Sequence, residues 1–493
     1  MQDNAPQGIH RAGIWQIGFF ALNNAAVNIY FMMMTYMSYY AAGVLGLSVA
    51  LVSGLLAALN VFDGITDPLI GLIIDKTNGR FGKFRPFMAI GNVILALDLV
   101  LLFMCRNAGA ATLPLLIVCF VIFDIGYTFQ FDVTRAAQTV LTNDPKQRPL
   151  FSAFDMVCNI ILYVGVSMVV SNYLIIKHGE FTADMFREFF IITAVSSAIC
   201  TVLAIIGIRS KDRPQYYGTA RGEQPKVKLR DCVDVLAHNR NVQMLMISAA
   251  TDKLFSHVTT NSVVVVMVFG IVCGDFALSG QMNMIVFAPS MAISLLCVWY
   301  ARRKGQRRAF LFATIGAMIA NAFIFFAFIF GSPTSLNFTS WGFFTIIFVV
   351  SLALRGGFMS IGSSIIIPMI GDCTDYEVYR SGKYIPGMIG GLFSFVDKIV
   401  ASLNTLIVGG LVILAGYRTM FPGIETPYSS EIFIIAMICY CGLPMIGWVV
   451  NLIALKYYNL TPEKMKEIRQ ARDTGAFTSD HTKISIDKYS TEE

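Results

Sequence analysis

Two aspartates, Asp63 and Asp67, lie within an otherwise apolar stretch that reads LVSGLLAALNVFDGITDPLIGLII over residues 51–74. A charged side chain at membrane depth costs roughly 2.5–3.5 kcal/mol on insertion scales, so its presence indicates a function. Thr66 lies between them, and positions i, i+3 and i+4 share one face of a helix. The carboxylate oxygens of the two aspartates and the hydroxyl of Thr66 suit a hard cation such as Na⁺, and the two carboxylates could instead share a proton. The alternative, that Asp67 and Pro68 only distort the helix, leaves Asp63 unexplained.

The composition places these residues in a membrane. Of the 493 residues, 56% are hydrophobic and 14% are charged, against roughly 25% charged in soluble proteins. Segments of about 20 apolar residues are long enough to span a bilayer. We predict twelve spans, at residues 13–41, 47–74, 86–105, 113–141, 150–175, 188–209, 242–270, 279–300, 309–330, 340–370, 387–415 and 432–456.

Basic residues lie mostly on one side of these spans, which predicts that both termini are cytoplasmic. The longest internal polar stretch divides the spans six and six. We therefore predict an all-α major facilitator fold with an N-terminal bundle (1–209), a cytoplasmic linker (210–241), a C-terminal bundle (242–457) and a cytoplasmic tail (458–493). In this arrangement the substrate site lies near the midplane between the halves. In the tail, Thr461-Pro462 predicts a helix over 461–473, and the remainder reads as disordered.

The loop after the second span is dense in charge and glycine, and it ends in RFGKFRP. We interpret its charged residues as an ionic latch that gates the cytoplasmic side. These residues are Asp75, Arg80, Lys83 and Arg85. The alternative is that they only set the topology.

Other polar residues at depth are candidates for substrate contacts. Lys398 lies about 12 residues into the eleventh span, beside Asp397, and either contacts substrate or partners the aspartates. The remaining candidates for the substrate site are Asn24, Asn28, Asp132, Arg135 and Asp155. Asn23 shares the first span with them, and each Asn could instead join helices.

Several function classes are excluded by what the sequence lacks. The five histidines are far apart, no phosphate-binding G-x-x-x-x-G-K-[ST] occurs, and the ten cysteines include no C-x-x-C. We expect no enzyme, no cofactor and no nucleic-acid partner.

The motifs together resemble the glycoside–pentoside–hexuronide:cation symporters, the melibiose-permease group of the major facilitator superfamily. The strings that carry the resemblance are FDGITDPLIGLIID-x4-RFGKFRP (62–86), YT…LTNDPKQR (127–148) and GDCTDYEVYRSGKY…FSFVDKI (371–399). The resemblance implies that Asp63, Thr66 and Asp67 hold the coupling cation, with Thr128 as a further ligand. It also implies that Lys398 links the sugar and cation sites.

The sugar site departs from the family pattern. Where sugar-binding members carry an aspartate on the first helix, this chain offers Asn23, Asn24 and Asn28. The family's fourth-helix Asp falls on Phe131, which is beside Asp132. The family's fourth-helix aromatic residue falls on Arg135. The family's fifth-helix Arg falls near Asp155. The resemblance thus implies cation coupling and leaves the substrate open.

We therefore expect a secondary active transporter of the cell membrane. It would couple Na⁺ or H⁺ to a glycoside- or hexuronide-type solute by alternating access, as a monomer. Lys253, Arg355 and Lys398 are basic at depth and favour a solute with an anionic group. The alternatives are a cation-coupled transporter of a non-sugar solute, and a transport-inactive membrane sensor or scaffold.

Overall fold

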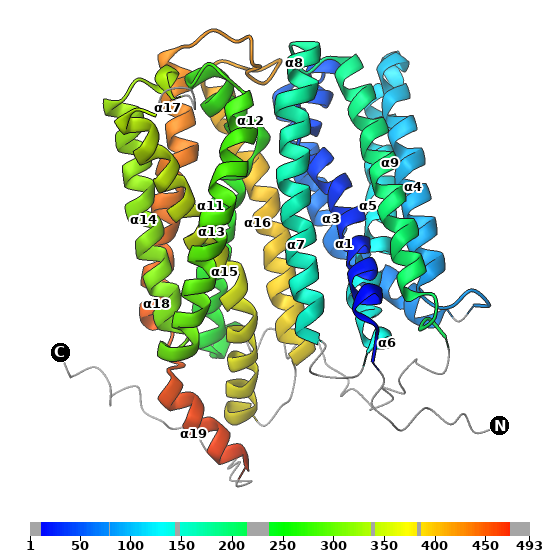
Figure 1. The fold of residues 1–493 in the computed structure, drawn as a ribbon, viewed down its shortest axis with the longest axis vertical. Helices are drawn as coiled ribbons and strands as arrows, with labels where there is room; N and C mark the ends of the chain where they lie inside the picture. Colours follow the sequence, from blue (N-terminus) through cyan, green and yellow to red (C-terminus); the bar gives the residue numbers. More distant parts are fainter. Residues whose placement is uncertain are drawn as a thin grey trace.

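The computed structural model describes residues 11–77, 79–142, 148–213, 236–336, 341–381 and 386–473. Over these residues the protein is helical, and a bridge between Gly79 and Gly82 is the only β-type pairing (Figure 1). A chain this apolar must satisfy its backbone hydrogen bonds internally, and helices do so within each segment. The side chains of Asp67, Asp75 and Arg135 lie outside the described part.

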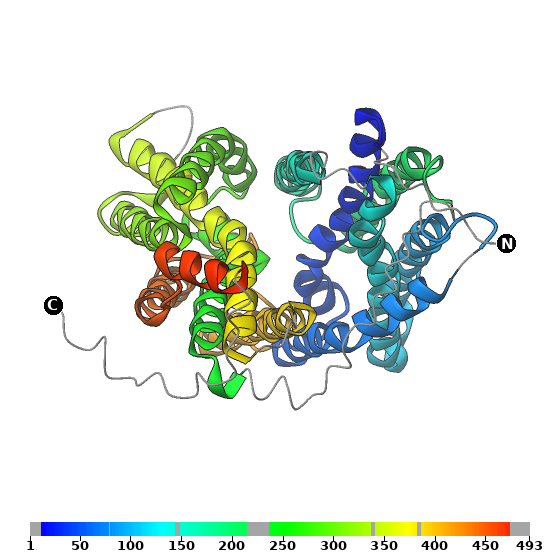
Figure 2. The same cartoon turned by 90° about the horizontal axis from the view of Figure 1, so that it is seen from below.

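The helices form two groups that lie side by side (Figures 1 and 2). The first group comprises α1 (Ile14–Met34), α2 (Met37–Tyr39), α3 (Val49–Lys76), α4 (Arg85–Met104), α5 (Thr112–Ala136), α6 (Gln138–Leu141), α7 (Arg148–Met168), α8 (Ile175–His178) and α9 (Ala183–Ile208). The second comprises α11 (Arg240–Thr260), α12 (Ser262–Val265), α13 (Ala277–Lys304), α14 (Gln306–Phe330), α15 (Phe343–Ser381), α16 (Pro386–Leu414), α17 (Ser430–Met437) and α18 (Leu443–Tyr457). The last described helix, α19 (Pro462–Asp473), follows them.

Ten of the described helices are long and apolar enough to cross a membrane. The number is eleven if α11 and α12–η6 (Ser262–Val272), which meet at a bend of 50°, count as one span. In α3 (Val49–Lys76), the described stretch Val49–Gly64 is a shorter apolar helix. Each predicted span falls on a described helix. The total of twelve spans and the cytoplasmic termini stay predictions.

The same helix pairs pack together in each group. In the first group α1 packs on α9, α7 and α5, and α5 packs on α3 and α4. In the second group α11 packs on α18, α16 and α15, and α15 packs on α13 and α14. The groups meet through α3 with α16 and through α7 with α13. The pairing therefore repeats between the halves, as in transporters built from structural repeats.

The hydrophobic core shows where the two groups join. At the ends away from the chain termini, here called the outer ends, one core runs through both groups and includes Tyr39, Phe120, Val264 and Phe421. At the opposite ends, each group has a core of its own. The two groups thus share one core at the outer ends and have separate cores at the opposite ends, where α19 and the start of α1 lie (Figure 1).

Polar side chains set the start of several helices. Each accepts a hydrogen bond from a backbone N–H in the first turn, which stabilises a helix by about 1 kcal/mol. These capping residues are Ser48 for α3, Thr182 for α9, Asn239 for α11 and Ser429 for α17. The predicted helix of the tail begins at Pro462 as α19, and Met465 and Ile468 on it are buried. Residues beyond 473, predicted to be disordered, lie outside the described part.

Candidate ion and solute site

The predicted cation residues of α3 lie against α5. The Thr66 hydroxyl donates a hydrogen bond of 2.6 Å to Oδ2 of Asp124 on α5. Asp124 and Thr128 are one turn apart on α5 and are both buried. The structure therefore brings Thr66 of α3 into contact with a carboxylate of α5 that lies one turn before Thr128.

Lys398 reaches this cluster from the other group of helices. Its ammonium on α16 donates to Oδ2 of Asp63 on α3, where the two groups pack together. The side chains of Lys398 and Asp63 are 22% and 15% exposed, so the ion pair is largely withdrawn from solvent. The two groups of helices are thus held by an ion pair at the predicted cation site.

The cluster is chemically suited to a small cation. The other carboxylate oxygen of Asp63, Oδ1, is buried and has no hydrogen-bond partner among the described residues. A buried acceptor without a partner is costly, and a cation or proton would satisfy it. Asp63, Thr66, Asp124 and Thr128 offer the carboxylate and hydroxyl oxygens that hard cations prefer.

Three of the predicted site residues cannot be placed by their side chains. Asp67 of the cation set, Arg135 of the substrate set and Asp75 of the gating set lie on described helices, but their side chains are outside the described part. Their roles stay predictions.

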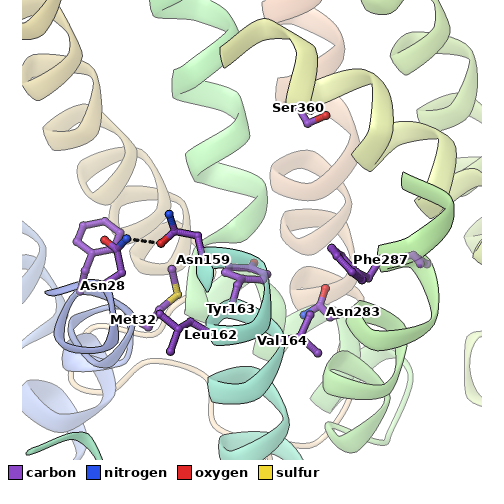
Figure 3. A pocket seen from close by; sticks show the side chains of 11 residues that line it. Asn28, Met32, Asn159, Leu162, Tyr163, Val164, Asn283, Phe287 and Ser360 are labelled. Atoms are coloured by element: carbon purple, nitrogen blue, oxygen red, sulfur yellow. Dashed lines mark hydrogen bonds between the residues drawn. The ribbon is translucent and has the colours of Figure 1, made fainter. Parts of the chain in front are cut away.

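A cavity of about 700 Å³ opens between the two groups of helices (Figure 3). Its polar lining consists of uncharged side chains, among them Asn28 of α1, Asn159 of α7 and Asn283 of α13. The lining also includes the aromatic rings of Phe31, Tyr163 and Phe287. Among the described lining residues none is charged. Nδ2 of Asn28 donates to Oδ1 of Asn159 at 2.5 Å, as Figure 3 shows.

Four other residues that were predicted to contact substrate do not line this cavity. Asn24, one turn before Asn28, contacts both Asn28 and the Asp155 side chain. Asp132 is half-buried on α5. The residues that line the cavity do not include Asn24, Asp132, Asp155 or Lys398. Asn23 points into the first group, where it bonds Gln130 and Thr134 of α5 and so joins helices.

The basic residues at depth already have partners. Lys253 of α11 pairs with Asp397 of α16, and Lys398 pairs with Asp63. The buried Arg355 guanidinium donates to Oδ1 of Asn321 at 3.1 Å and lies 4.2 Å from the Tyr440 ring centre. Lys253 and Lys398 are thus paired with carboxylates, whereas the partners of Arg355 are uncharged, and the anionic group expected on the solute stays a prediction.

The charged loop after α3 is organised by a residue that follows α9. Buried Asp212 accepts backbone N–H bonds from Lys83 and Arg85, at 2.9 and 3.0 Å, and pairs with the Arg85 side chain at 3.3 Å. Gly82 has a φ of 98°, and a Cβ there would lie 2.1 Å from Oδ2 of Asp212. Glycine is therefore required at position 82. The Arg80 side chain, in the same loop, is exposed.

Replacing Asp212 with alanine is expected to destabilise the protein by about 3 kcal/mol, because the backbone N–H groups and the Arg85 side chain lose a buried acceptor. Thermal unfolding of the purified protein in detergent measures the effect. Glu467→Ala is the control with a small expected effect, since Glu467 is exposed and its partner Lys464 is on the same helix. An Asp212→Ala variant that melts like the wild type would show that Asp212 does not hold the loop.

The sequence analysis assigned no role to four residues of these networks. Asp124 could have been found, because it lies one turn before Thr128 and so shares its face of α5. Asn159 and Asp397 bond residues of other helices, and no local pattern reveals such partners. Asp212 lies within the predicted linker 210–241, yet it packs on the start of α4.

Comparison with known proteins agrees with this architecture. Residues 19–462 match the family described as MFS/sugar transport protein. The isoprimeverose transporter of Lactiplantibacillus pentosus is 21% identical, over 92% of this chain and 90% of that protein. A putative glycoside/cation symporter of Escherichia coli is 22% identical, over 88% of each chain. The glucuronide carrier protein homolog of the same organism is 22% identical, over 91% of this chain and 93% of that protein.

Solved structures show the same fold. The crystal structure of the nucleoside transporter NupG superposes with a TM-score of 0.61 at 13% identity, and covers 91% of this chain and 99% of that chain. The resemblance drawn from the sequence motifs is confirmed. The chain belongs to the MFS/sugar transport protein family, as a multi-pass cell-membrane transporter of the glycoside–pentoside–hexuronide:cation symporter type.

Proposed function

We propose that the protein couples the inward movement of a monovalent cation, Na⁺ or H⁺, to uptake of a sugar-type solute. The observation that carries the proposal is the ion pair between Asp63 and Lys398, which joins the two groups of helices beside the oxygens of Thr66, Asp124 and Thr128. Asp67, adjacent in the sequence motif, completes the proposed cation site.

In this proposal Lys398 is a tethered cation that competes with the coupling ion. The ammonium of Lys398 occupies Oδ2 of Asp63, so a Na⁺ ion or proton on that carboxylate removes the attraction between α3 and α16. Cation loading then changes how the two groups of helices are held together. This competition provides the coupling, because it links the ion to the relative position of the halves.

The solute binds in the cavity between the groups. Amide side chains such as Asn28, Asn159 and Asn283 donate and accept hydrogen bonds, which suits sugar hydroxyls. The aromatic faces of Phe31 and Phe287 suit the apolar faces of a sugar ring. Asp132 and Arg135 stay candidates for contacts in other conformations.

The bundles 1–209 and 242–457 rock about this site. The groups are joined at the outer ends, where Tyr39 donates to the carbonyl of Pro422 at 3.1 Å and Asn172 donates to that of Ala277 at 3.3 Å. Both termini are predicted to be cytoplasmic, and on that prediction the state with joined outer ends is the inward-facing state of the proposed cycle. The loop residues Asp75, Arg80, Lys83 and Arg85 stabilise the opposite, outward-facing state.

Uptake into proteoliposomes tests the proposal. With isoprimeverose and lactose as probes, an inward Na⁺ or proton gradient is expected to drive accumulation above the external concentration. Imposing each gradient alone identifies the ion. Equal internal and external sugar under every gradient would contradict cation coupling.

A further inference from the structure

One face of α7 runs from the cavity into the contact with α13. Asn159, Tyr163 and Ser167 are spaced four residues apart, so they follow one another along one face of the helix. Asn159 and Tyr163 line the cavity, as Figure 3 shows. Ser167, one turn further toward the outer end, instead accepts a hydrogen bond of 3.1 Å from Nδ2 of Asn283 on α13. This bond therefore lies where the cavity ends and the contact between the two halves begins.

Asn283 belongs both to the cavity and to this contact. Its side chain lines the cavity together with Phe287, which is one turn further along α13. The bond to Ser167 uses one N–H of the amide, and Oδ1 has no partner among the described residues. An asparagine side chain has two N–H donors and a carbonyl acceptor. Asn283 thus keeps its acceptor and one donor for a solute while it holds Ser167.

The contact continues outward from this bond and is here called the α7–α13 junction. Gln281 donates to Oδ1 of Asn172 at 3.2 Å, and Asn172 lies in the π-helical segment η4 (Val169–Leu174) that continues α7. Neither Gln281 nor Asn172 lines the cavity. Among the described side-chain bonds of this junction, the one between Asn283 and Ser167 alone includes a residue that lines the cavity.

The bond between Asn283 and Ser167 depends on the state of the protein, because α13 and α7 belong to different halves. While the outer ends are joined, Ser167 orients the amide of Asn283. Donation through Nδ2 also polarises the amide, so its Oδ1 becomes a better acceptor. In a state with parted outer ends this support is lost, and a solute must order the amide itself. A solute bound to Asn283 therefore has a higher affinity for the joined state, and a ligand favours the state that it binds more tightly.

We propose that Asn283 binds the solute and that Ser167, as a positioning residue, makes this contact depend on closure of the outer ends. The inference rests on the proposed function and deepens it by assigning the residues through which solute occupancy controls the α7–α13 junction. The solute binds both states, but the joined one more tightly, so its arrival in the cavity closes the outer ends. The cation acts on a different contact between the halves, at the ion pair of Asp63 and Lys398 between α3 and α16.

Sugar-induced closure of the purified full-length protein tests this proposal. The probes are isoprimeverose and lactose at saturation, and spin labels at Gly43 and Glu425, both exposed at the outer ends, report the ratio of joined to parted molecules. All measurements use a Gly409→Ala background, in which a Cβ 2.0 Å from Oγ of Ser53 raises the population of the parted state until both states are measurable. At least one sugar is expected to raise the ratio about fivefold or more, as one net hydrogen bond does.

Four variants in this background separate solute contact from packing. Asn283→Ala is expected to lose the sugar-induced change and to bind sugar about fivefold or more weakly by isothermal titration. Ser167→Ala should also lose the change, whereas Ser167→Thr keeps the hydroxyl and should retain it. Gln281→Ala is the matched control, because it removes another bond of the same junction but no cavity residue. It should lower the starting ratio, and sugar should still raise that ratio by the factor seen without the substitution, since this factor equals the ratio of the two affinities.

Three results would overturn the proposal. They are an unchanged ratio when sugar binds, a full response in Asn283→Ala, and a response lost in Gln281→Ala as completely as in Ser167→Ala, which would mean that the junction acts only through its packing. If Asn283→Ala does not fold, Asn283→Ser shortens the side chain and must lose the response too. Binding of neither sugar would overturn this inference together with the sugar-type solute of the proposed function. Loss of gradient-driven uptake with sugar-induced closure intact would contradict the proposed coupling alone.

Discussion

Asp63→Asn is expected to abolish cation-driven accumulation of the solute. A membrane potential of about 100 mV is worth about 2.3 kcal/mol per monovalent cation, which supports roughly 50-fold accumulation. Asparagine keeps the size of the side chain but removes the charge that attracts the ion. It also leaves the Lys398 ammonium without the carboxylate that it contacts. Accumulation in proteoliposomes should fall from tens of fold to none.

Exchange of solute between the two sides provides the internal control, because it needs no net ion movement. Asp63→Asn should retain a measurable part of the wild-type exchange rate, which shows that the variant folds and still binds solute. Asp184→Asn is the control, since Asp184 is an exposed acid in the first turn of α9, in the same half and outside the site. Retained accumulation in Asp63→Asn, with Asp184→Asn also normal, would remove Asp63 from the coupling mechanism.

The residues of the proposed cation site stand out in the sequence because their signal is local, and their role stays a prediction. Asp63 and Thr66 lie within one turn of a single apolar helix, so the cost of a buried charge and the helical repeat are both readable in the sequence. The twelve apolar segments likewise mark the helices of the described structure, because span length follows from the thickness of the bilayer.

The partners of the basic residues at depth could not be predicted, because they lie on distant helices. The sequence shows Lys253, Arg355 and Lys398 as three basic residues, and only the fold shows that two of them pair with carboxylates and that Arg355 bonds an amide. The partners lie 34 to 335 positions away in the sequence, beyond the reach of any helical repeat.

Gly409→Leu and Gly280→Leu are expected to stop transport by preventing closure of the outer ends. A Cβ on Gly409 of α16 would lie 2.0 Å from Oγ and 2.7 Å from Cβ of Ser53 on α3. A Cβ on Gly280 of α13 would lie 2.3 Å from Oγ of Ser171 and 3.3 Å from the Cα of Met168. Both glycines thus allow the close approach of the two groups in the state described here.

The clash raises the free energy of only one conformational state, the one with joined outer ends, and therefore shifts the equilibrium between states. Leucine at either position penalises the state with joined outer ends and leaves a state with parted outer ends unaffected. A clash of about 3 kcal/mol shifts the equilibrium between them by more than 100-fold. Spin labels at Gly43 and Glu425, both exposed at the outer ends, should report a longer distance in the variants than in the wild type.

Gly410→Leu separates this effect from a general loss of stability. Gly410 is the next residue on α16, and a Cβ there would meet nothing within 4 Å among the described residues. The control should transport like the wild type and give the wild-type label distance. Because solute binding does not require closed outer ends, the Gly409 and Gly280 variants should still bind sugar while uptake falls at least tenfold. If Gly409→Leu and Gly410→Leu behave alike, the close approach of α3 and α16 does not control closure, and the outer ends must be held by the wider core alone.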